Sequence, residues 1–252
     1  MERQIEAVIF DLGGTLIEYA GQYLYWPELE TPGLEAAYQY LDGKGVLLPP
    51  FDEFRDSAFA RLPARWQEAT DGDRNLRLVD FLAELLEANQ VVDVPADWID
   101  EAAQDYQATI CARAEMIDGA RETLAALKEQ GYRIGLLSNT MFNGSIHVTD
   151  LQRFGLDSYF DAMLFSADLN MWKPNAAPYL YLLERLQVAP ANAVFIGDSP
   201  NHDIVCGTGA GLHAIYFHSS DRFGEPDGVQ PDATIHHLNE LPHVLSVWAL
   251  ET

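Results

Sequence analysis

Short runs of apolar residues, each bounded by turn-forming residues, recur along this chain with room for a helix between most of them. They predict buried strands over Ile5–Phe10, Tyr132–Leu137, Ala162–Ser166, Ala193–Ile196 and Leu212–Phe217, with a last short strand near Ala233–His236. Strands that are apolar throughout are buried on both faces, so we expect an α/β fold with a parallel sheet between two layers of helices.

Helical spacing of apolar residues separates several of these strands. Gly119–Gln130 is expected to form a helix with Asp118 as its N-cap and Gly131 just beyond its end, and Ala176–Leu186 is expected to form another. Alternating strands and helices place an active site at the carboxyl ends of the strands in an open parallel sheet.

One long segment breaks this alternation. From residue 20 to residue 113 the pattern is that of amphipathic helices, for example Leu76–Asn89 and Pro95–Ala112, with no convincing buried strand. We therefore expect two domains: an α/β core formed by residues 1–19 and 114–252, and a helical domain, residues 20–113, inserted after the first strand.

Composition narrows the class of protein. The 252 residues include 39 acidic and 15 basic side chains, a formal charge of −24 that repels nucleic acid and anionic membranes. Two cysteines make no disulfide framework, and the first residues do not form a secretion signal, so we expect a cytoplasmic protein that is a monomer or a homodimer.

Polar residues and glycines follow the first predicted strand. Asp11 ends this strand, and Gly13, Gly14 and Thr15 come directly after it. A buried carboxylate is costly unless it is paired or hydrogen-bonded, and paired glycines let the main chain turn tightly beside a ligand. This sequence favours a functional carboxylate over a simple turn cap.

Three later segments bring further chemistry to the same sheet edge. Ser138 and Asn139 end the second strand, Lys173 follows the third, and Asp198 and Asp203 follow the fourth. The lysine is one of only three in the chain. Carboxylates this close together need a cation at neutral pH, and oxygen ligands are those that Mg²⁺ prefers. The pattern predicts a magnesium site beside an anion-binding lysine.

These four segments, in this order and spacing, resemble the motifs of the haloacid dehalogenase-like hydrolase superfamily across almost the whole chain. The resemblance implies a Rossmann-like core, with the helical insertion between the first and second motifs acting as a mobile cap. It also implies a phosphatase of small phosphorylated metabolites in which Asp11 is the nucleophile and forms an aspartyl-phosphate.

The same resemblance assigns roles to the other motif residues. Ser138 and Lys173 would assist catalysis by holding the phosphoryl oxygens, and Thr15 and Asn139 would help to bind the substrate. The Mg²⁺ ligands would be Asp11, the main-chain carbonyl of Gly13, Asp198 and, through water, Asp203.

Position 13 departs from the phosphatase pattern, which has an aspartate two residues after the nucleophile as general acid and base. Here that residue is Gly13. The loss leaves the carbonyl ligand in place but removes a group worth roughly 10²–10⁴ in rate. Glu18, near the expected hinge, is one candidate substitute.

Alternatives remain open on this evidence. A dehalogenase of the superfamily needs no metal, a phosphonate-cleaving member needs a cap lysine, which would be Lys44, and a catalytically weak protein could retain the phosphate and metal pocket. Three arginines of the helical domain recur at near-helical spacing, which is typical of a solvated face with carboxylate neighbours, and they are also the candidates for binding the nonreacting part of an anionic substrate: Arg55, Arg61 and Arg65. His202 is expected either in the site or at a helix start, and Trp66 and Trp98 in the helical core.

Overall fold

The computed structural model describes residues 5–19, 25–219, 228 and 230–250. The expected domain boundary at residue 20 lies outside the described residues. Within them, no helix is both long and apolar enough to cross a membrane.

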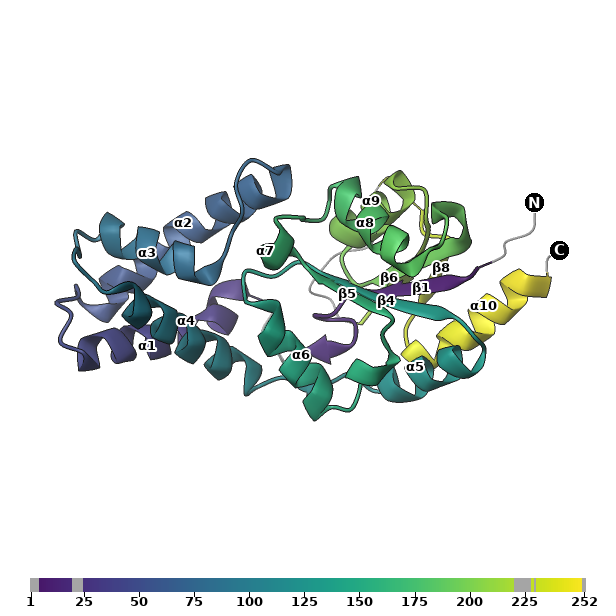
Figure 1. The fold of residues 1–252 in the computed structure, drawn as a ribbon, viewed down its shortest axis with the longest axis horizontal. Coiled ribbons are helices and arrows are strands. Elements are labelled where there is room, and N and C mark those ends of the chain that lie inside the picture. The colour runs from purple at the N-terminus through teal and green to yellow at the C-terminus, as the bar shows by residue number, and fades with distance from the viewer. Residues whose placement is uncertain (1–4, 20–24, 220–227, 229, 251–252) are drawn as a thin grey trace.

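A six-stranded sheet forms the centre of one half of the molecule (Figure 1). Its order is β5-β4-β1-β6-β7-β8, and every neighbouring pair is parallel. The strands are β1 (Ala7–Phe10), β4 (Arg133–Ser138), β5 (Ala162–Phe165), β6 (Ala193–Gly197), β7 (His213–Phe217) and β8 (Ala233–Ile235). All six predicted strands are present, with ends shifted by two residues at most.

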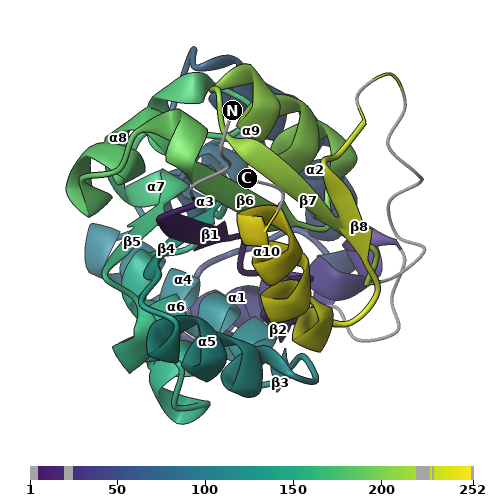
Figure 2. The ribbon, with the colours of Figure 1, turned by 90° about the vertical axis from the view of Figure 1, so that its right-hand side faces the viewer.

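Helices cover both faces of this sheet (Figure 2). One face packs on α5 (Ala120–Glu129), α6 (Gly144–Arg153) and α10 (Leu241–Leu250), and the other on α8 (Ala176–Leu186) and α9 (Val205–Gly209). Alternate residues of β1 point to opposite layers, since Val8 and Phe10 join the first apolar cluster and Ala7 and Ile9 the second. The predicted three-layer α/β fold is therefore confirmed.

Four helices lie between β1 and α5 along the chain, and they lie beyond one end of the sheet (Figure 1). They are α1 (Trp26–Gly43), α2 (Phe51–Asp71), α3 (Leu78–Ala88) and α4 (Ala96–Cys111), here called the four-helix segment. Their apolar faces form a cluster separate from those of the sheet, joined by Met141, Phe142, Ala167 and Trp172 from the segments that follow β4 and β5.

A small ribbon that the sequence did not reveal lies where the chain enters and leaves the four-helix segment. In it β2 (Ile17–Glu18) pairs antiparallel with β3 (Glu115–Met116). Two residues per strand are too few to produce a readable alternation. The remaining short elements are η1 (Asp157–Tyr159), α7 (Ser166–Leu169), η2 (Pro190–Asn192), the π-helix η3 (Pro200–Ile204) and η4 (Leu238–Glu240).

The predicted start of α5 was wrong in detail. Gly119, not Asp118, is its N-cap residue, and no side chain caps the helix. Gly119 has a φ of +81°, a conformation that glycine adopts without the strain a side chain would bring.

Candidate active site

The strand order explains why residues far apart in sequence meet. β1 lies between β4 and β6, so the residues at the carboxyl ends of these three strands share one edge of the sheet. Asp11, Ser138 and Asp198 stand there, each no more than 8% exposed, and Lys173 joins them from the loop before α8 at 2%. The structure brings together the residues that four separate motifs predicted.

Lys173 is the centre of this group. Its Nζ donates to Oδ1 of Asp11 at 2.9 Å and to Oδ1 of Asp203 at 2.7 Å. Asp203 is fully buried, and its Oδ2 accepts from the main-chain N–H of Ser199 at 2.9 Å. One ammonium thus holds two carboxylates from different strand ends in fixed positions.

Burial and charge compete at these groups. Burial, together with the nearby Asp203, raises the pKa of Asp11 to about 6, against the opposing influence of Lys173. Burial alone would lower the pKa of Lys173, but the carboxylates of Asp11 and Asp203 outweigh it and raise that pKa. Lys173 therefore stays positively charged. Asp11 is ionised at neutral pH, and further positive charge nearby would stabilise its carboxylate form.

Asp11, Asp198 and Asp203 form a compact acidic group, each offering an oxygen within 4.8 Å of the others. Glycines make the room for it. A Cβ at Gly14 would lie 2.2 Å from Oδ2 of Asp198, and one at Gly197 would lie 2.1 Å from Oδ2 of Asp203. Three carboxylates together are a set of hard oxygen ligands suited to a divalent cation.

Two of the predicted substrate contacts look different in the structure. Asn139 lines the cavity described below, but its Nδ2 donates to the main-chain oxygen of Lys173 at 2.7 Å and its Oδ1 accepts from the Lys173 N–H at 2.8 Å. Asn139 therefore positions the lysine loop. Thr15 is completely buried and does not line the cavity, so a substrate contact for it stays a prediction.

A cavity of about 520 Å³ opens over this edge of the sheet and extends to the four-helix segment. Asp11, Ser138, Lys173 and Asp198 line one end of it. Several other lining residues were not predicted: Tyr19, Trp26, Leu29, Glu30, Leu62, Pro63, Ile110, Met141, Phe142 and His147. Glu18 and His202, both left open by the sequence, line it as well, and Trp66 lines it rather than lying only in the helical core.

The arginines predicted to grip an anion do not line this cavity. Arg55 pairs with Asp52 and Asp56. Arg65 is buried, with its Nε 2.9 Å from Glu84. Carboxylates on α2 and α3 pair with these cations locally, as expected for a helix face with carboxylate neighbours. Arg61 does not line the cavity either; it donates to the Ser57 side chain at 2.9 Å.

Lys44 also lies away from the cavity. It follows α1 on the surface, with its Nζ 3.7 Å from Glu101 and near the rings of Tyr40 and Trp98. This position disfavours the phosphonate-cleaving alternative, because the lysine required as a Schiff base cannot face the reacting group.

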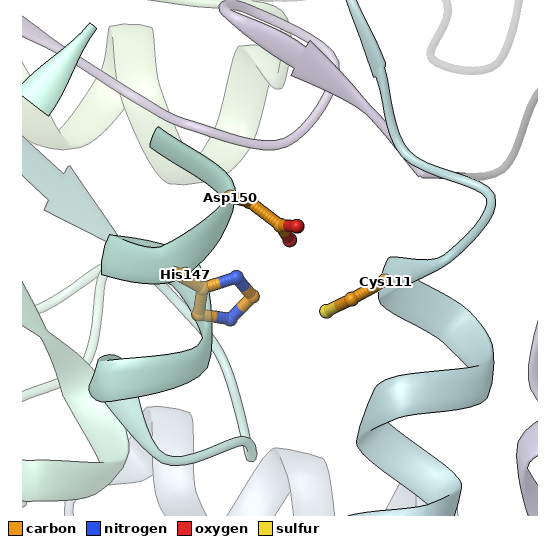
Figure 3. A group of neighbouring side chains, drawn as sticks. All are labelled: Cys111, His147 and Asp150. Carbon is orange, nitrogen blue, oxygen red and sulfur yellow. The ribbon is translucent and has the colours of Figure 1, made fainter. Parts of the chain in front are cut away.

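A second polar cluster joins the four-helix segment to the sheet half. Cys111 ends α4, and His147 and Asp150 point toward it from α6 (Figure 3). Both ring nitrogens of His147 have hydroxyl partners, Tyr19 at 3.0 Å and Thr140 at 2.9 Å. Burial raises the pKa of the Cys111 thiol, which stays protonated. The cluster therefore forms a hydrogen-bonded junction between the two halves.

Comparison with known proteins agrees with this geometry. Residues 5–211 match the family model described as haloacid dehalogenase-like hydrolase. The chain is 26% identical over 249 residues to a ribulose-1,5-bisphosphate 5-phosphatase of Halopiger xanaduensis, covering 95% of this chain and 99% of that one. It is 28% identical over 249 residues to a phosphoglycolate phosphatase of Escherichia coli, covering 94% and 91%. A 2-haloacid dehalogenase structure from Pseudomonas syringae superposes with a TM-score of 0.73 at 25% identity, covering 97% of this chain and all of that one.

Proposed function

Because the chain belongs to the haloacid dehalogenase-like hydrolase family, we propose that it is a Mg²⁺-dependent phosphatase of small phosphorylated metabolites. One observation carries the proposal: Asp11 is buried at the floor of the cavity, within hydrogen-bond distance of a buried lysine and beside two further carboxylates. Both full-length relatives compared above are named as phosphatases.

Asp11 is the proposed nucleophile. Its carboxylate oxygen attacks phosphorus, the bond from phosphorus to the ester oxygen breaks, and water then hydrolyses the aspartyl-phosphate on Asp11. The carboxylate must be ionised to attack, which a pKa of about 6 permits at neutral pH. Lys173 holds Asp11 in place and faces the incoming phosphoryl oxygens with positive charge, and the Ser138 hydroxyl at the same edge donates to them.

The acidic group fits the proposed cation. Asp11 and Asp198, with the main-chain carbonyl of Gly13 and water held by Asp203, would supply hard oxygen donors. When bound, Mg²⁺ neutralises the phosphoryl group and the carboxylates around it. Lys173 compensates only part of the charge of three carboxylates, which is why the donor set favours a cation over an empty pocket.

We also propose that the four-helix segment is a cap, with residues 20–113 inserted into a core of residues 1–19 and 114–252. Support comes from its separate apolar cluster and from the β2–β3 ribbon at the crossing. The cap supplies the walls of the cavity above the reacting end, so it would hold the leaving group.

The test is hydrolysis of acetyl phosphate and nitrophenyl phosphate by the purified protein, with Mg²⁺ and with chelator. We expect phosphate release that needs Mg²⁺ and disappears in Asp11→Asn, whereas Asp161→Asn, a surface carboxylate paired with Lys128, should behave as wild type. Metal-independent chloride release from a 2-chloro acid, with no phosphate release, would instead establish the dehalogenase alternative suggested by the structural neighbour.

A further inference from the structure

The part of the cavity above the reacting end is largely apolar. Trp26 and Leu29 of α1, Leu62 and Trp66 of α2, and Phe142 after β4 contribute to its walls. A concave site of this kind binds the apolar portion of a ligand and uses a few polar groups to fix its orientation. The apolar walls therefore indicate which shape and polarity of leaving group the cavity can bind.

The two tryptophans are held by other aromatic rings. Trp66 packs edge-on against Trp172, with centroids 5.2 Å apart and planes at 80°, and Trp26 packs edge-on against Phe59 at 5.1 Å and 75°. Such contacts fix the orientation of both rings before a ligand arrives. A fixed aromatic wall favours a ligand with a broad apolar face, because no ordering of the wall is needed on binding.

The charge of this region is the second observation. Glu18 and Glu30 line the cavity, and Lys173 is the one lysine or arginine among its described lining residues. Lys173 is already bonded to Asp11 and Asp203. The charge of Arg113 acts on Glu30 and lowers its pKa, but Arg113 does not line the cavity.

His147 does not change this balance. Burial lowers the pKa of His147 to about 4, so this ring is not a cation at neutral pH. A second anionic group on the substrate would thus meet the carboxyl groups of Glu18 and Glu30 and apolar walls, with no lysine or arginine besides Lys173 on the described lining to compensate it. Burying such a charge unpaired is strongly unfavourable.

We propose that the leaving group is an uncharged or cationic alcohol with a broad apolar, preferably aromatic, face, whose donor groups bond to Glu18 and Glu30. The site accordingly rejects phosphate esters that carry a second anionic group, unlike the bisphosphate and glycolate esters named for the relatives. This inference rests on the proposed phosphatase function, since it concerns the group on the far side of the ester oxygen.

Two esters that differ by one remote charge provide the test. Benzyl phosphate and 4-carboxybenzyl phosphate share the same reacting centre, so a difference in kcat/KM reports the cavity rather than the chemistry. We expect wild type to prefer benzyl phosphate by at least about tenfold, and to hydrolyse phosphoglycolate more weakly still. Equal rates for the two benzyl esters, or a preference for the carboxylated one, would overturn the inference.

Substitutions of single residues show which cavity side chains produce the preference between the esters. Trp66→Ala should lower kcat/KM for benzyl phosphate more than for acetyl phosphate, which has no group to place against the wall. Trp98→Ala removes a tryptophan of α4 that does not line the cavity, and should leave both rates unchanged. At pH 8, above the Glu30 pKa of about 7, Glu30→Gln should reduce the discrimination against the carboxylated ester, because it removes a repelling charge while keeping an acceptor for the Tyr106 hydroxyl.

Binding separates this inference from the proposed function. Benzylphosphonate and 4-carboxybenzylphosphonate cannot be hydrolysed, and their dissociation constants follow from quenching of tryptophan fluorescence. Preferential binding of the uncharged compound supports the inference even if no ester is turned over, in which case the phosphatase proposal alone fails. Turnover of acetyl phosphate without any preference between the phosphonates overturns the inference and leaves the phosphatase proposal standing.

Discussion

Gly13 provides the most direct test of the proposed chemistry. It lines the cavity two residues after Asp11, at the position where the phosphatase pattern has an aspartate that acts as general acid and base. The structure has room there for the first atom of a side chain. The nearest heavy atom to a Cβ built on Gly13 is Cδ2 of Tyr19 at 3.8 Å, an ordinary contact, and the residue does not adopt a left-handed φ. Gly13→Asp should therefore fold with little loss of stability.

The expected gain depends on the leaving group. Protonation by a positioned acid is worth roughly 10²–10⁴ in rate, which corresponds to about 3 to 5 kcal/mol of barrier. An alkyl phosphate needs that proton, because an alkoxide is a poor leaving group, whereas nitrophenolate leaves without it. We therefore expect kcat for benzyl phosphate to rise by about 100-fold or more in Gly13→Asp, and kcat for nitrophenyl phosphate to rise much less.

Matched variants make the measurement decisive. Gly13→Asn has almost the same shape but no acid, so it should show no gain, and Gly13→Ala reports any cost of adding a side chain. Stability of each variant is measured by urea unfolding. A folded Gly13→Asp with no gain on benzyl phosphate would refute the reasoning if wild type is slow on that ester. If wild type is already fast, another cavity group supplies the proton, and Glu30, whose pKa burial raises to about 7, is the first to replace.

Three further predictions address the metal, the junction and the domains. Mg²⁺ at 100 times its dissociation constant should stabilise the protein by about 2.7 kcal/mol and raise Tm by several degrees, an effect absent in Asp198→Asn; an unchanged wild-type Tm would remove metal from the proposal. Acidification from pH 6.5 to about 4 should lower the unfolding free energy of wild type relative to that of His147→Gln by about 1.4 kcal/mol per pH unit. The reason is that His147 binds a proton in the unfolded chain but stays neutral when buried in the folded one. Urea unfolding measures both free energies, and an equal pH dependence for the two proteins would contradict the prediction. Replacing residues 20–113 by a short Gly/Ser linker should leave cooperative unfolding, since β1 keeps both partners, β4 and β6, while Phe142 and Trp172 become exposed and increase dye binding; loss of the transition would argue against an independent core.

The sheet and its site were predictable because local sequence specifies them. A strand buried on both faces must be apolar throughout, so Ile5–Phe10 and Ala193–Ile196 were visible as strands without any tertiary information. Parallel strands then bring their carboxyl ends to one edge, which is enough to place Asp11 beside Asp198. The same topology brings the loop that carries Lys173 to this edge, where the lysine pairs with Asp11. The path of that loop, however, could not be predicted from the sequence spacing.

The cavity walls were not predictable for the opposite reason. Along α2, Arg65 and Trp66 are neighbours in sequence, yet the first is buried against Glu84 and the second lines the cavity. Which of two adjacent helical positions faces the site depends on how the four helices pack together and on the angle set by the β2–β3 ribbon, and periodicity fixes neither. For the same reason, the sequence could not decide whether the arginines of α2 face the cavity or pair with neighbouring carboxylates. Arg55 and Arg65 of α2 pair with neighbouring acidic residues and do not line the cavity. The cavity wall beyond the reacting end therefore consists mainly of carboxyl groups and apolar or aromatic side chains. The chain has a net charge of −24, and Lys173, at the reacting end, is the one lysine or arginine among the described lining residues. The rest of the described lining therefore has no lysine or arginine that could pair with the remainder of the substrate.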